Sequence, residues 1–480
     1  MCSSDLRGSV VTGPEHDHTV KVDAAGLEPG TWYHYRFRAL GRTSRVGRTR
    51  TAPARGAALD NLRLGFVSCA NWQAGWFSAY RGLAARDDLD VIVHLGDYIY
   101  EYGRGEYGYG KDDVDIRPHV PAHEILTLRD YRRRHGQYKT DADLQDLHAR
   151  YPWIVTWDDH EVADNQWSGG AANHQPATEG DWLTRRAGAH RAYDEWMPVR
   201  LSGTTVVGDG ERIYRRFHFG DLASLSMLDL RSYRSEQVDL TAGDPGAVDD
   251  PDRTITGAAQ RTWLLHSLDD TSVQWKLIGN PVMIAPVDFG TLPADVATSV
   301  HDALGVVPTD GVPYNTDQWD GYTADRKRVL EHLADRRTRD VVFLTGDIHS
   351  GWAADVPADA STYPVVGDSL AVEFVGASIT SNNLKDITGT PPRTTSVVVE
   401  TAIKAANRHI RYLDFDSHGF CVLDVTPART QCDWFVIGDR ADRDTPITWS
   451  VSWRTAAGRS EEHTSELQSP MYLVCRLLLE

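Results

Sequence analysis

Short apolar runs recur along this chain, and each is long enough to form one buried β-strand. Segments with helical spacing lie between several of them, for example at residues 322–336. This alternation predicts a layered α/β domain, and β-rich stretches at residues 214–229 and 420–437 predict mixed sheets. The runs lie at residues 64–69, 90–95, 153–157, 275–278, 341–345 and 370–375.

Polar side chains stand at the ends of four of these runs. Ligands of open α/β sheets bind beyond the carboxyl ends of the strands, so we expect these groups to meet at one edge. Their clustered oxygen and nitrogen atoms suit hard and borderline cations, including Fe(III), Ca, Mn and Zn. A glycine before Asp97 and before Asp347 should let the backbone turn sharply, so that each carboxylate faces the site. The groups are Cys69, then Asp97 and Tyr100, then Asp158-Asp159-His160-Glu161 with Asn165, and finally Asp347 and His349.

Each strand end has a simpler interpretation when it is taken alone. Asp97 could be only a turn or helix cap, and Cys69 a small buried apolar residue. The acidic run at residues 158–161 could be a solvated turn, and Asp347 with His349 a hydrogen-bonded pair. Independent turn chemistry would rarely produce four such ends in one chain, so a shared site is favoured.

The segment before the α/β region is β-rich. The L-x-P-x-T-x-Y pattern from Leu27 to Tyr33 resembles the tyrosine corner of fibronectin-III and immunoglobulin-like sandwiches. Such a sandwich needs roughly 100 residues, and only about half of that is present. We therefore expect residues 7–53 to be a truncated fibronectin-III/Ig-like β domain, joined by a linker near Pro53 and Gly56 to an α/β domain at residues 62–455.

The two ends of the chain resemble translated sequencing-library adapters. Residues 2–6 read CSSDL, and residues 459–469 read RSEEHTSELQS. We expect residues 1–6 and 459–480 to be non-native; the alternative is a polar tail carrying a short apolar run at residues 471–479. An export signal would then be missing from this chain.

Composition excludes several classes of protein. Apolar residues at 41% and charged residues at 25% are those of a globular protein. The chain has 68 acidic and 50 basic residues, so its net charge of −18 disfavours nucleic-acid binding through general positive charge. No apolar run reaches the roughly 18 residues of a membrane span. Five cysteines do not make a disulfide framework, although Cys421 and Cys432 could pair in an oxidising compartment.

Taken together, the motifs resemble the PhoD-type alkaline phosphatase/phosphodiesterase family. The strings VSCAN, HLGDYIYEYG, WDDHEVADN, DQWDGY, LTGDIHS and EFVGASITS occur in the family's order across residues 62–453. The β-rich stretch at residues 20–51 is similar to the end of that family's N-terminal domain. The resemblance implies a calcineurin-like metallophosphatase, which is a four-layer α/β/β/α sandwich.

The resemblance also implies a site with one Fe(III) and two Ca²⁺ ions. Asp97 would bridge metals, since a carboxylate has two oxygens to share. The tripeptide Asn407-Arg408-His409 departs from the expected Asn-Pro-His, which puts a role for His409 in question. The implied positions are Cys69, Asp97 and Tyr100 near iron, and Asp159, Asn165, Asp347 and His349 among the remaining metal-facing motifs, with Asp158 as a second candidate beside Asp159.

This site predicts metal-dependent hydrolysis of phosphate esters, with release of phosphate at alkaline pH. Metal cations neutralise the anionic ester and lower the pKa of bound water towards ~7, so a metal-activated hydroxide or oxide would attack in line. His160 would donate a proton to the leaving oxygen, or else contact the phosphate. Asp97 and His160 are thus the expected catalytic residues. A charge-stabilising arginine is expected among residues 132–134, the rest of that run being a solvated helix face.

Three functions are compatible with these observations. The first is an exported phosphatase or phosphodiesterase acting on small phosphate esters or phosphodiester polymers in phosphate acquisition. The second is a nuclease or nucleotidase on the same scaffold. The third, a non-catalytic surface-binding module, leaves the four polar strand ends unexplained and ranks last. The family's usual twin-arginine export implies an extracellular, periplasmic or cell-wall location, while the sequence leaves the oligomeric state and the monoester or diester preference open.

Overall fold

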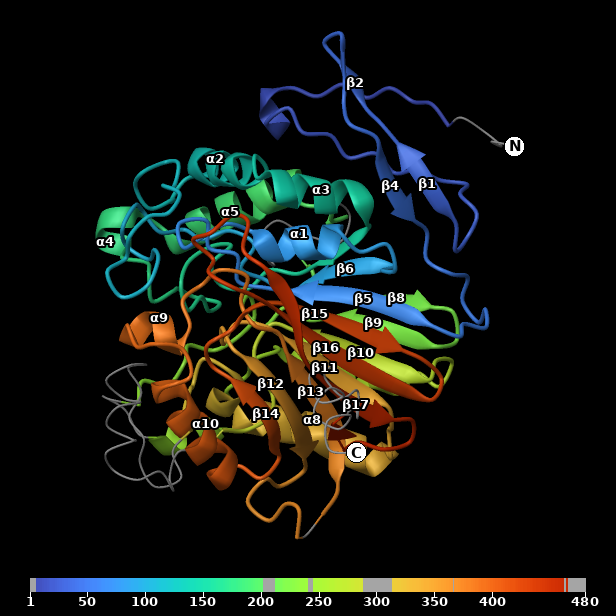
Figure 1. Ribbon diagram of the computed structural model, residues 1–480, viewed down its shortest axis with the longest axis vertical. Helices are drawn as coiled ribbons and strands as arrows, with labels where there is room; N and C mark the ends of the chain where they lie inside the picture. The colour runs from blue at the N-terminus through green and yellow to red at the C-terminus, as the bar shows by residue number, and fades with distance from the viewer. Residues whose placement is uncertain are drawn as a thin grey trace, which may run out of the picture.

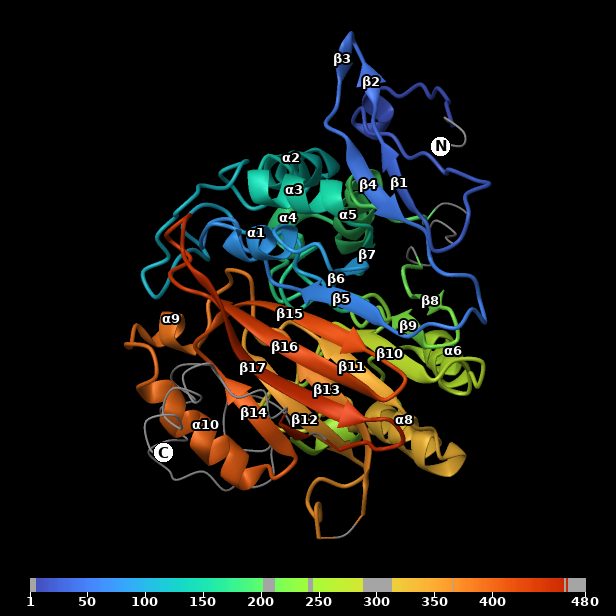
Figure 2. The ribbon, with the colours of Figure 1, turned by 45° about the vertical axis from the view of Figure 1, so that its right-hand side comes forward.

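Two stacked β-sheets form the centre of the molecule, and helices cover the outer face of each (Figures 1 and 2). The computed structural model describes residues 6–201, 212–240, 245–287, 313–365, 367–461 and 463–464. Within these residues each of the two sheets has seven strands. The four-layer α/β/β/α sandwich expected from the sequence is therefore confirmed.

The first sheet has the strand order β18-β17-β16-β15-β5-β6-β7. Three parallel strands, β5 (Leu62–Val67), β6 (Val91–His94) and β7 (Trp153–Val155), form one half. The other half is antiparallel and consists of β15 (His418–Val425), β16 (Arg429–Ile437), β17 (Ile447–Ala456) and β18 (His463–Thr464). β18 lies in the segment expected to be adapter-derived, and the origin of that segment stays a prediction.

The second sheet has the order β14-β12-β13-β11-β10-β9-β8. Its central strands are parallel: β9 (Ala223–Met227), β10 (Trp275–Asn280), β11 (Val341–Thr345) and β13 (Ser369–Val375). Antiparallel strands flank them: β8 (Arg215–Phe219), β12 (Gly351–Pro357) and β14 (Ile410–Asp414). Both sheets are mixed, as predicted.

The helices fall into two groups, one on each outer face (Figure 1). The first sheet is covered by α1 (Ser78–Ala84), α2 (Leu128–Tyr138), α3 (Ala142–Arg150) and α5 (Trp182–Trp196), with the short α4 (Pro176–Glu179) beside them. The second sheet is covered by α6 (Ala258–Leu268), α8 (Thr323–Arg336) and α10 (Thr395–Ala406), with the short α9 (Leu384–Thr388) near the site. Among the described helices, none combines the length and apolar character needed to cross a bilayer.

Three apolar cores lie between the four layers. In β6, Ile92 packs toward the helices, whereas Val91 and Val93 face the other sheet. In β11, Val342 and Leu344 face the first sheet, while Val341 and Phe343 pack against the second set of helices. Alternating strand residues point to opposite faces of a sheet, so a strand buried on both faces is apolar throughout. This explains the continuous apolar runs in the sequence.

The N-terminal segment forms two short antiparallel ribbons. One pairs β1 (Trp32–Tyr35) with β4 (Gly47–Arg50), and the other pairs β2 (Arg38–Ala39) with β3 (Arg42–Thr43). The backbone N–H of Glu28 donates to the hydroxyl of Tyr33 at 2.8 Å, which is the hydrogen bond of a tyrosine corner. The guanidinium of Arg48 lies 4.5 Å from the ring centroid of Trp32 and 5.0 Å from that of Tyr151, and so joins this segment to the α/β domain.

Cys421 and Cys432 are buried between the two sheets, and no disulfide joins them. In the β15–β16 ladder Cys421 lies opposite Trp434, and Cys432 lies opposite Leu423. The two cysteines are therefore not cross-strand partners, and each acts as a small apolar core residue.

A lysine amine is buried where α2 ends. Nζ of Lys139 donates to the hydroxyl of Tyr98 and lies 3.2 Å from Nε2 of His148. No carboxylate pairs with Lys139 in the described part of the chain. Burial without a counter-ion lowers the pKa of Lys139 to about 7.

We expect Lys139→Met to raise stability at pH 7 and to flatten the pH dependence of stability above pH 7. Between about 7 and the ordinary 10.5, the unfolded chain binds a proton at Lys139 that the folded chain does not bind. The free energy of unfolding of the unmodified protein therefore rises with pH through this window, by at most ~1.4 kcal/mol per pH unit from this residue. Below the window both states carry the proton, and the cost of burying the charge is fully present.

Urea unfolding at several pH values across this window measures the difference. Lys327→Met is the matched control, because the Lys327 side chain is 74% exposed and its charge is not buried on folding. Parallel stability curves for Lys139→Met and the unmodified protein would contradict the assignment.

Candidate metal centre

The four predicted strand ends meet at one place, where the carboxyl ends of the two sheets come together. β5, β6 and β7 belong to the first sheet, but β11 belongs to the second. The expectation of a single sheet edge is therefore wrong, since the site straddles both sheets. Face-to-face stacking makes this possible: a side chain on Gly346, after β11, would lie 2.6 Å from Oγ of Ser68, after β5.

Several of the predicted site residues have left-handed backbone conformations. The φ angles of Cys69, Asp97, Asn165, Asp347 and His349 are 61°, 57°, 54°, 64° and 53°. Such a conformation costs a non-glycine residue roughly 1–3 kcal/mol and persists only where the surrounding structure imposes it. It turns the chain abruptly at the strand end, which brings these side chains into the space between the sheets.

The two glycines act differently from each other. Gly96 has φ of 112°, and a Cβ there would lie 2.4 Å from Cβ of Asp158, so both conformation and space require glycine. Gly346 has no left-handed φ. It is needed only because Ser68 lies so close, and the turn that follows is made by Asp347 itself. The predicted glycine turn is thus confirmed at Gly96 and wrong at Gly346.

Potential ligand atoms form three overlapping groups. In each group the ligand atoms lie within 4.8 Å of one another. Asp97 belongs to the first two groups, and Asp159 belongs to the last two. The groups are Cys69 with Asp97 and His349, Asp97 with Asp159 and His160, and Asp158 with Asp159 and Asp347.

The Tyr100 phenol points into the first of these groups. Its hydroxyl donates to Oδ2 of Asp97 at 2.9 Å and lies 3.4 Å from Nε2 of His349. Oδ1 of Asp97 is buried and has no hydrogen-bond partner. A buried carboxylate oxygen without a partner is costly, and a cation held by the neighbouring thiol, phenol and imidazole would satisfy it. These residues therefore fit a metal ion.

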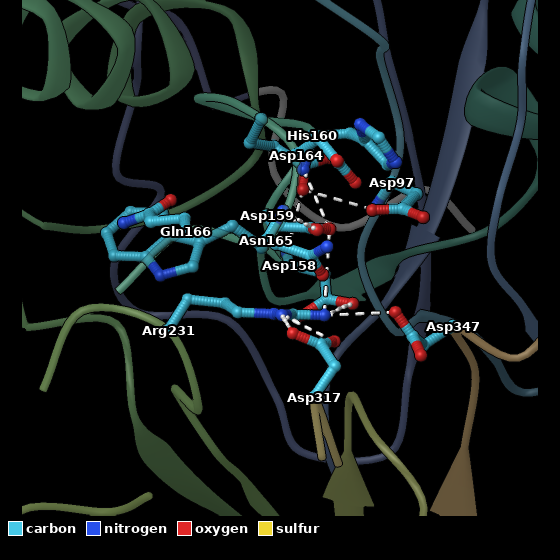
Figure 3. Close-up of polar contacts among 12 residues, drawn as sticks. Asp97, Asp158, Asp159, His160, Asp164, Asn165, Gln166, Arg231, Asp317 and Asp347 are labelled. Carbon is cyan, nitrogen blue, oxygen red and sulfur yellow. Dashed lines mark hydrogen bonds and ion pairs between the residues drawn. The ribbon is translucent and has the colours of Figure 1, made fainter. Parts of the chain in front are cut away.

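Arg231 lies within the acidic side of the site, as Figure 3 shows. The Arg231 guanidinium is fully buried. It binds both oxygens of Asp158, donates to both oxygens of Asp317 at 2.8 Å, and donates to Oδ1 of Asp347 at 2.9 Å. Nη2 of Arg231 also lies 3.7 Å from Oδ1 of Asp159. This one cation is therefore shared among four carboxylates.

Burial and the neighbouring charges together shift the pKa values of the cluster. Burial raises the pKa of Asp97 and of Asp347 well above the usual range, and neighbouring carboxylates raise them further. Burial alone would lower the pKa of His160, but the carboxylates of Asp159 and Glu101 outweigh it and raise that pKa. The cluster thus holds more negative charge than its own cationic side chains neutralise, which is the condition that favours bound cations.

Comparison with known proteins identifies the family. The family model described as PhoD-like phosphatase matches residues 64–434, and the model for the N-terminal domain of PhoD-like phosphatases matches residues 3–53. The chain belongs to the PhoD-like phosphatase family. It is similar to alkaline phosphatase D of Bacillus subtilis (strain 168), with 36% identity over 433 residues that cover 90% of this chain and 68% of the relative. It is also similar to a solved structure of PhoD, with a TM-score of 0.81 and 33% identity over 95% of this chain and 81% of that chain.

This membership confirms the resemblance seen in the motifs. The protein is a hydrolase that cleaves phosphate esters with the help of metal ions, so the hypothesis of a non-catalytic module is wrong. The fold agrees as well, because the match to PhoD extends over nearly the whole chain.

Two buried glutamates hold residues of the phosphatase site in place through hydrogen bonds. Glu161 accepts hydrogen bonds from the backbone N–H groups of Asp97 and Asp158, at 3.0 and 2.7 Å. Glu101 accepts from Nδ1 of His160 at 2.8 Å and from the backbone of Asp164 at 2.7 Å. Glu161 therefore joins two strand ends, and Glu101 fixes the orientation of the His160 ring.

The arginine run at residues 132–134 does not reach the site. Arg132 pairs with the buried Glu195, Arg133 is exposed, and only Arg134 is fully buried, as expected of one inward member. Arg134 donates to the backbone carbonyls of Tyr100 and Tyr102, so it holds the segment that carries Tyr100. The expectation of a phosphate-binding arginine in this run is wrong, because these carbonyls occupy the guanidinium.

His409 also lies outside the three ligand groups. Its Nε2 hydrogen-bonds to the carbonyl of Pro286 at 2.7 Å, and burial lowers its pKa to about 4. The neutral ring therefore has a structural partner, which agrees with the departure of this tripeptide from the expected motif.

Sequence reasoning missed Arg231 and Glu101. Arg231 follows β9 in the stretch Leu228-Asp229-Leu230-Arg231, which repeats the pattern of a buried strand followed by polar residues. Glu101 is the residue directly after Tyr100. Both could have been found by extending the strand-end search to every strand and to every charged residue near its end.

We expect Arg231→Met to destabilise the phosphatase strongly. The substitution removes the shared cation and leaves Asp158 and Asp347 buried without it, and breaking a buried ion pair in this way costs about 3–5 kcal/mol. Urea unfolding in the presence of a chelator measures the loss. Arg336→Met is the control, because the side chain of Arg336 is 65% exposed and its replacement should change stability by less than about 0.5 kcal/mol. Equal stability of the two variants would show that Arg231 does not stabilise the buried carboxylates.

Proposed function

We propose that the strand-end cluster holds one Fe(III) and two Ca²⁺ ions and hydrolyses phosphomonoesters, phosphodiesters or both. The observation that carries this proposal is the overlap of the three ligand groups through Asp97 and Asp159. A carboxylate has two oxygens, so each of these residues can serve two neighbouring cations. A chain of adjacent cations is the arrangement that best neutralises a phosphoryl group.

The donor chemistry supports a division between the metals. Cys69, Asp97, Tyr100 and His349 would hold Fe(III), since thiolate, phenolate and imidazole are ligands of transition metals. Asp159, Asn165 and Asp347 would hold calcium, which prefers oxygen ligands. The two aspartates would supply carboxylate oxygens, and Asn165 would supply the carbonyl oxygen of its side-chain amide. Both oxygens of Asp158 already accept from Arg231, which favours Asp159 over Asp158 as the ligand.

When bound, these cations would neutralise the ester and lower the pKa of a water nucleophile towards ~7. The protein itself supplies geometry and a proton. Glu161 holds the turns at Asp97 and Asp158, and Arg231 orients the carboxylates of Asp158 and Asp347. The His160 ring is stacked on the Tyr100 ring with centroids 4.2 Å apart, and Nδ1 of this ring is hydrogen-bonded to Glu101. Its Nε2 is then the nitrogen that would donate a proton to the leaving oxygen.

Family membership supports an exported enzyme that releases phosphate from esters outside the cytoplasm. The similarity to alkaline phosphatase D favours activity above neutral pH. Elemental analysis of the purified protein, with activity on a monoester and a diester before and after chelation, tests the metals and the substrate class together.

We expect Asp97→Asn to abolish hydrolysis while the fold is retained. The amide keeps the size of the carboxyl group but cannot carry the charge that two cations would share. kcat/KM should fall by at least about 10²–10³-fold, the scale on which loss of one charge-stabilising group slows an enzyme, and metal content should fall with it. Asp335→Asn, at an exposed position on α8, is the control. Near-normal turnover with full metal content would show that Asp97 does not bridge metals.

We expect His160→Gln to slow esters according to their leaving group. An alkyl phosphate needs a proton on its leaving oxygen, so its hydrolysis should fall by about 10²–10⁴-fold. A nitrophenyl phosphate leaves as a stable anion and should be affected far less. Glu101→Gln should give the same pattern in weaker form. An equal loss for both esters would mean that His160 contacts the phosphate instead of donating a proton.

A further inference from the structure

A loop after β13 closes the site on the side of Cys69. It spans residues 376–383 and contacts three of the proposed iron ligands. Oγ of Ser381 lies 2.6 Å from the hydroxyl of Tyr100. The backbone carbonyl of Asn382 lies 2.9 Å from Nδ1 of His349. The backbone N–H groups of Thr380 and Ser381 donate to the carbonyl of Cys69, each at 3.3 Å.

A buried polar network holds this loop in place. Arg440 donates to the carbonyl of Thr380 and to Oδ1 of Asn382, the latter at 2.7 Å. Oγ of Ser378 lies 2.9 Å from Nδ1 of His418, whose Nε2 lies 2.8 Å from Oδ2 of Asp386. The loop is thus fixed at both of its ends, and its side chains at Ser378 and Ser381 are fully buried.

The single proton of the Ser381 hydroxyl has two possible acceptors, which are the carbonyl of Cys69 at 3.0 Å and the oxygen of Tyr100 at 2.6 Å. The Cys69 carbonyl already accepts two backbone N–H groups. The Tyr100 hydroxyl donates its own proton to Asp97, so its oxygen can accept. We therefore assign the Ser381 proton to the shorter hydrogen bond, in which the oxygen of Tyr100 is the acceptor.

We propose that Ser381 is a positioning residue that orients the Tyr100 oxygen toward the metal and reduces the electron density that this oxygen donates. The proposal rests on the proposed function, in which Tyr100 binds Fe(III). Partners that hydrogen-bond to a metal ligand orient it and tune the metal, and their loss typically costs about 10–100-fold in metal affinity or activity. A phenolate that receives a hydrogen bond is a weaker electron donor than one that does not.

The test is the visible absorption of the purified holoenzyme, in which a Tyr100–Fe(III) bond gives a phenolate-to-iron charge-transfer band. Ser381→Ala removes the hydrogen bond and makes the phenolate a stronger donor, so the band should shift to longer wavelength and the iron reduction potential should fall. Ser381→Thr keeps a hydroxyl and should restore both values. Ser381→Cys, a close match in size with a weak donor, should shift the band in the same direction as alanine and replaces it if the alanine variant does not fold.

Thr380→Val is the matched control, because Thr380 lies in the same loop and is equally buried, but its hydroxyl donates to the backbone carbonyl of Asn71 instead of a proposed ligand. It should leave the band unchanged. An unshifted band in Ser381→Ala, or an equal shift in Thr380→Val, would overturn the role of Ser381 while leaving the iron site intact. Failure of the proposed iron site is a separate result: the unmodified enzyme would lack the band, or Tyr100→Phe would retain it.

Discussion

Carboxylates buried at the strand ends must be matched by positive charge, and much of the structure around the site serves that balance. Burial raises the pKa of Asp97, Asp158 and Asp347 and so opposes their ionisation. Arg231 supplies one guanidinium, shared among Asp158, Asp347 and Asp317, and Arg234 supplies a second at Asp317. Neither guanidinium forms an ion pair with Asp97, and Oδ1 of Asp97 has no partner. The site is therefore built as a receptor for metal ions, which would complete a charge balance that the side chains leave unfinished.

The stacking of two sheets explains why so many ligands can converge. A single parallel sheet presents its strand ends in a row, with about 4.8 Å between neighbours. Here the ends of β5, β6 and β7 face the end of β11 across the sandwich, so the ligands approach from two sides. The left-handed turns at Cys69, Asp97, Asp347 and His349 then direct the side chains into the gap. The packed cores on either side offset the conformational cost of these turns, because their buried apolar strands hold the strand ends in place.

The strands and the candidate ligands could be predicted because both are local properties of the sequence. The run at residues 341–345 is β11 without change, and the helix predicted at residues 322–336 is α8 to within one residue. The partnership of Arg231 with Asp158 and Asp347 could not be predicted in the same way. It joins residues that are 73 and 116 positions apart, and nothing local in the sequence marks such a pair. The role of Gly346 was misassigned for the same reason, because the need for glycine comes from Ser68 in the other sheet.

Buried arginines hold the segments and carboxylates that form the site. Arg134 binds the carbonyls next to Tyr100, Arg231 binds the carboxylates, and Arg440 binds the loop that carries Ser381. Arginine suits this interior above neutral pH, because burial lowers the pKa of Arg134 only to about 10, whereas it lowers the pKa of Lys139 to about 7. A lysine at the position of Arg134, where no carboxylate of the described residues pairs with the cation, would lose its charge above neutral pH. The guanidinium also offers several N–H donors in a fixed plane, so a single side chain can hold carbonyls or carboxylates from different strands.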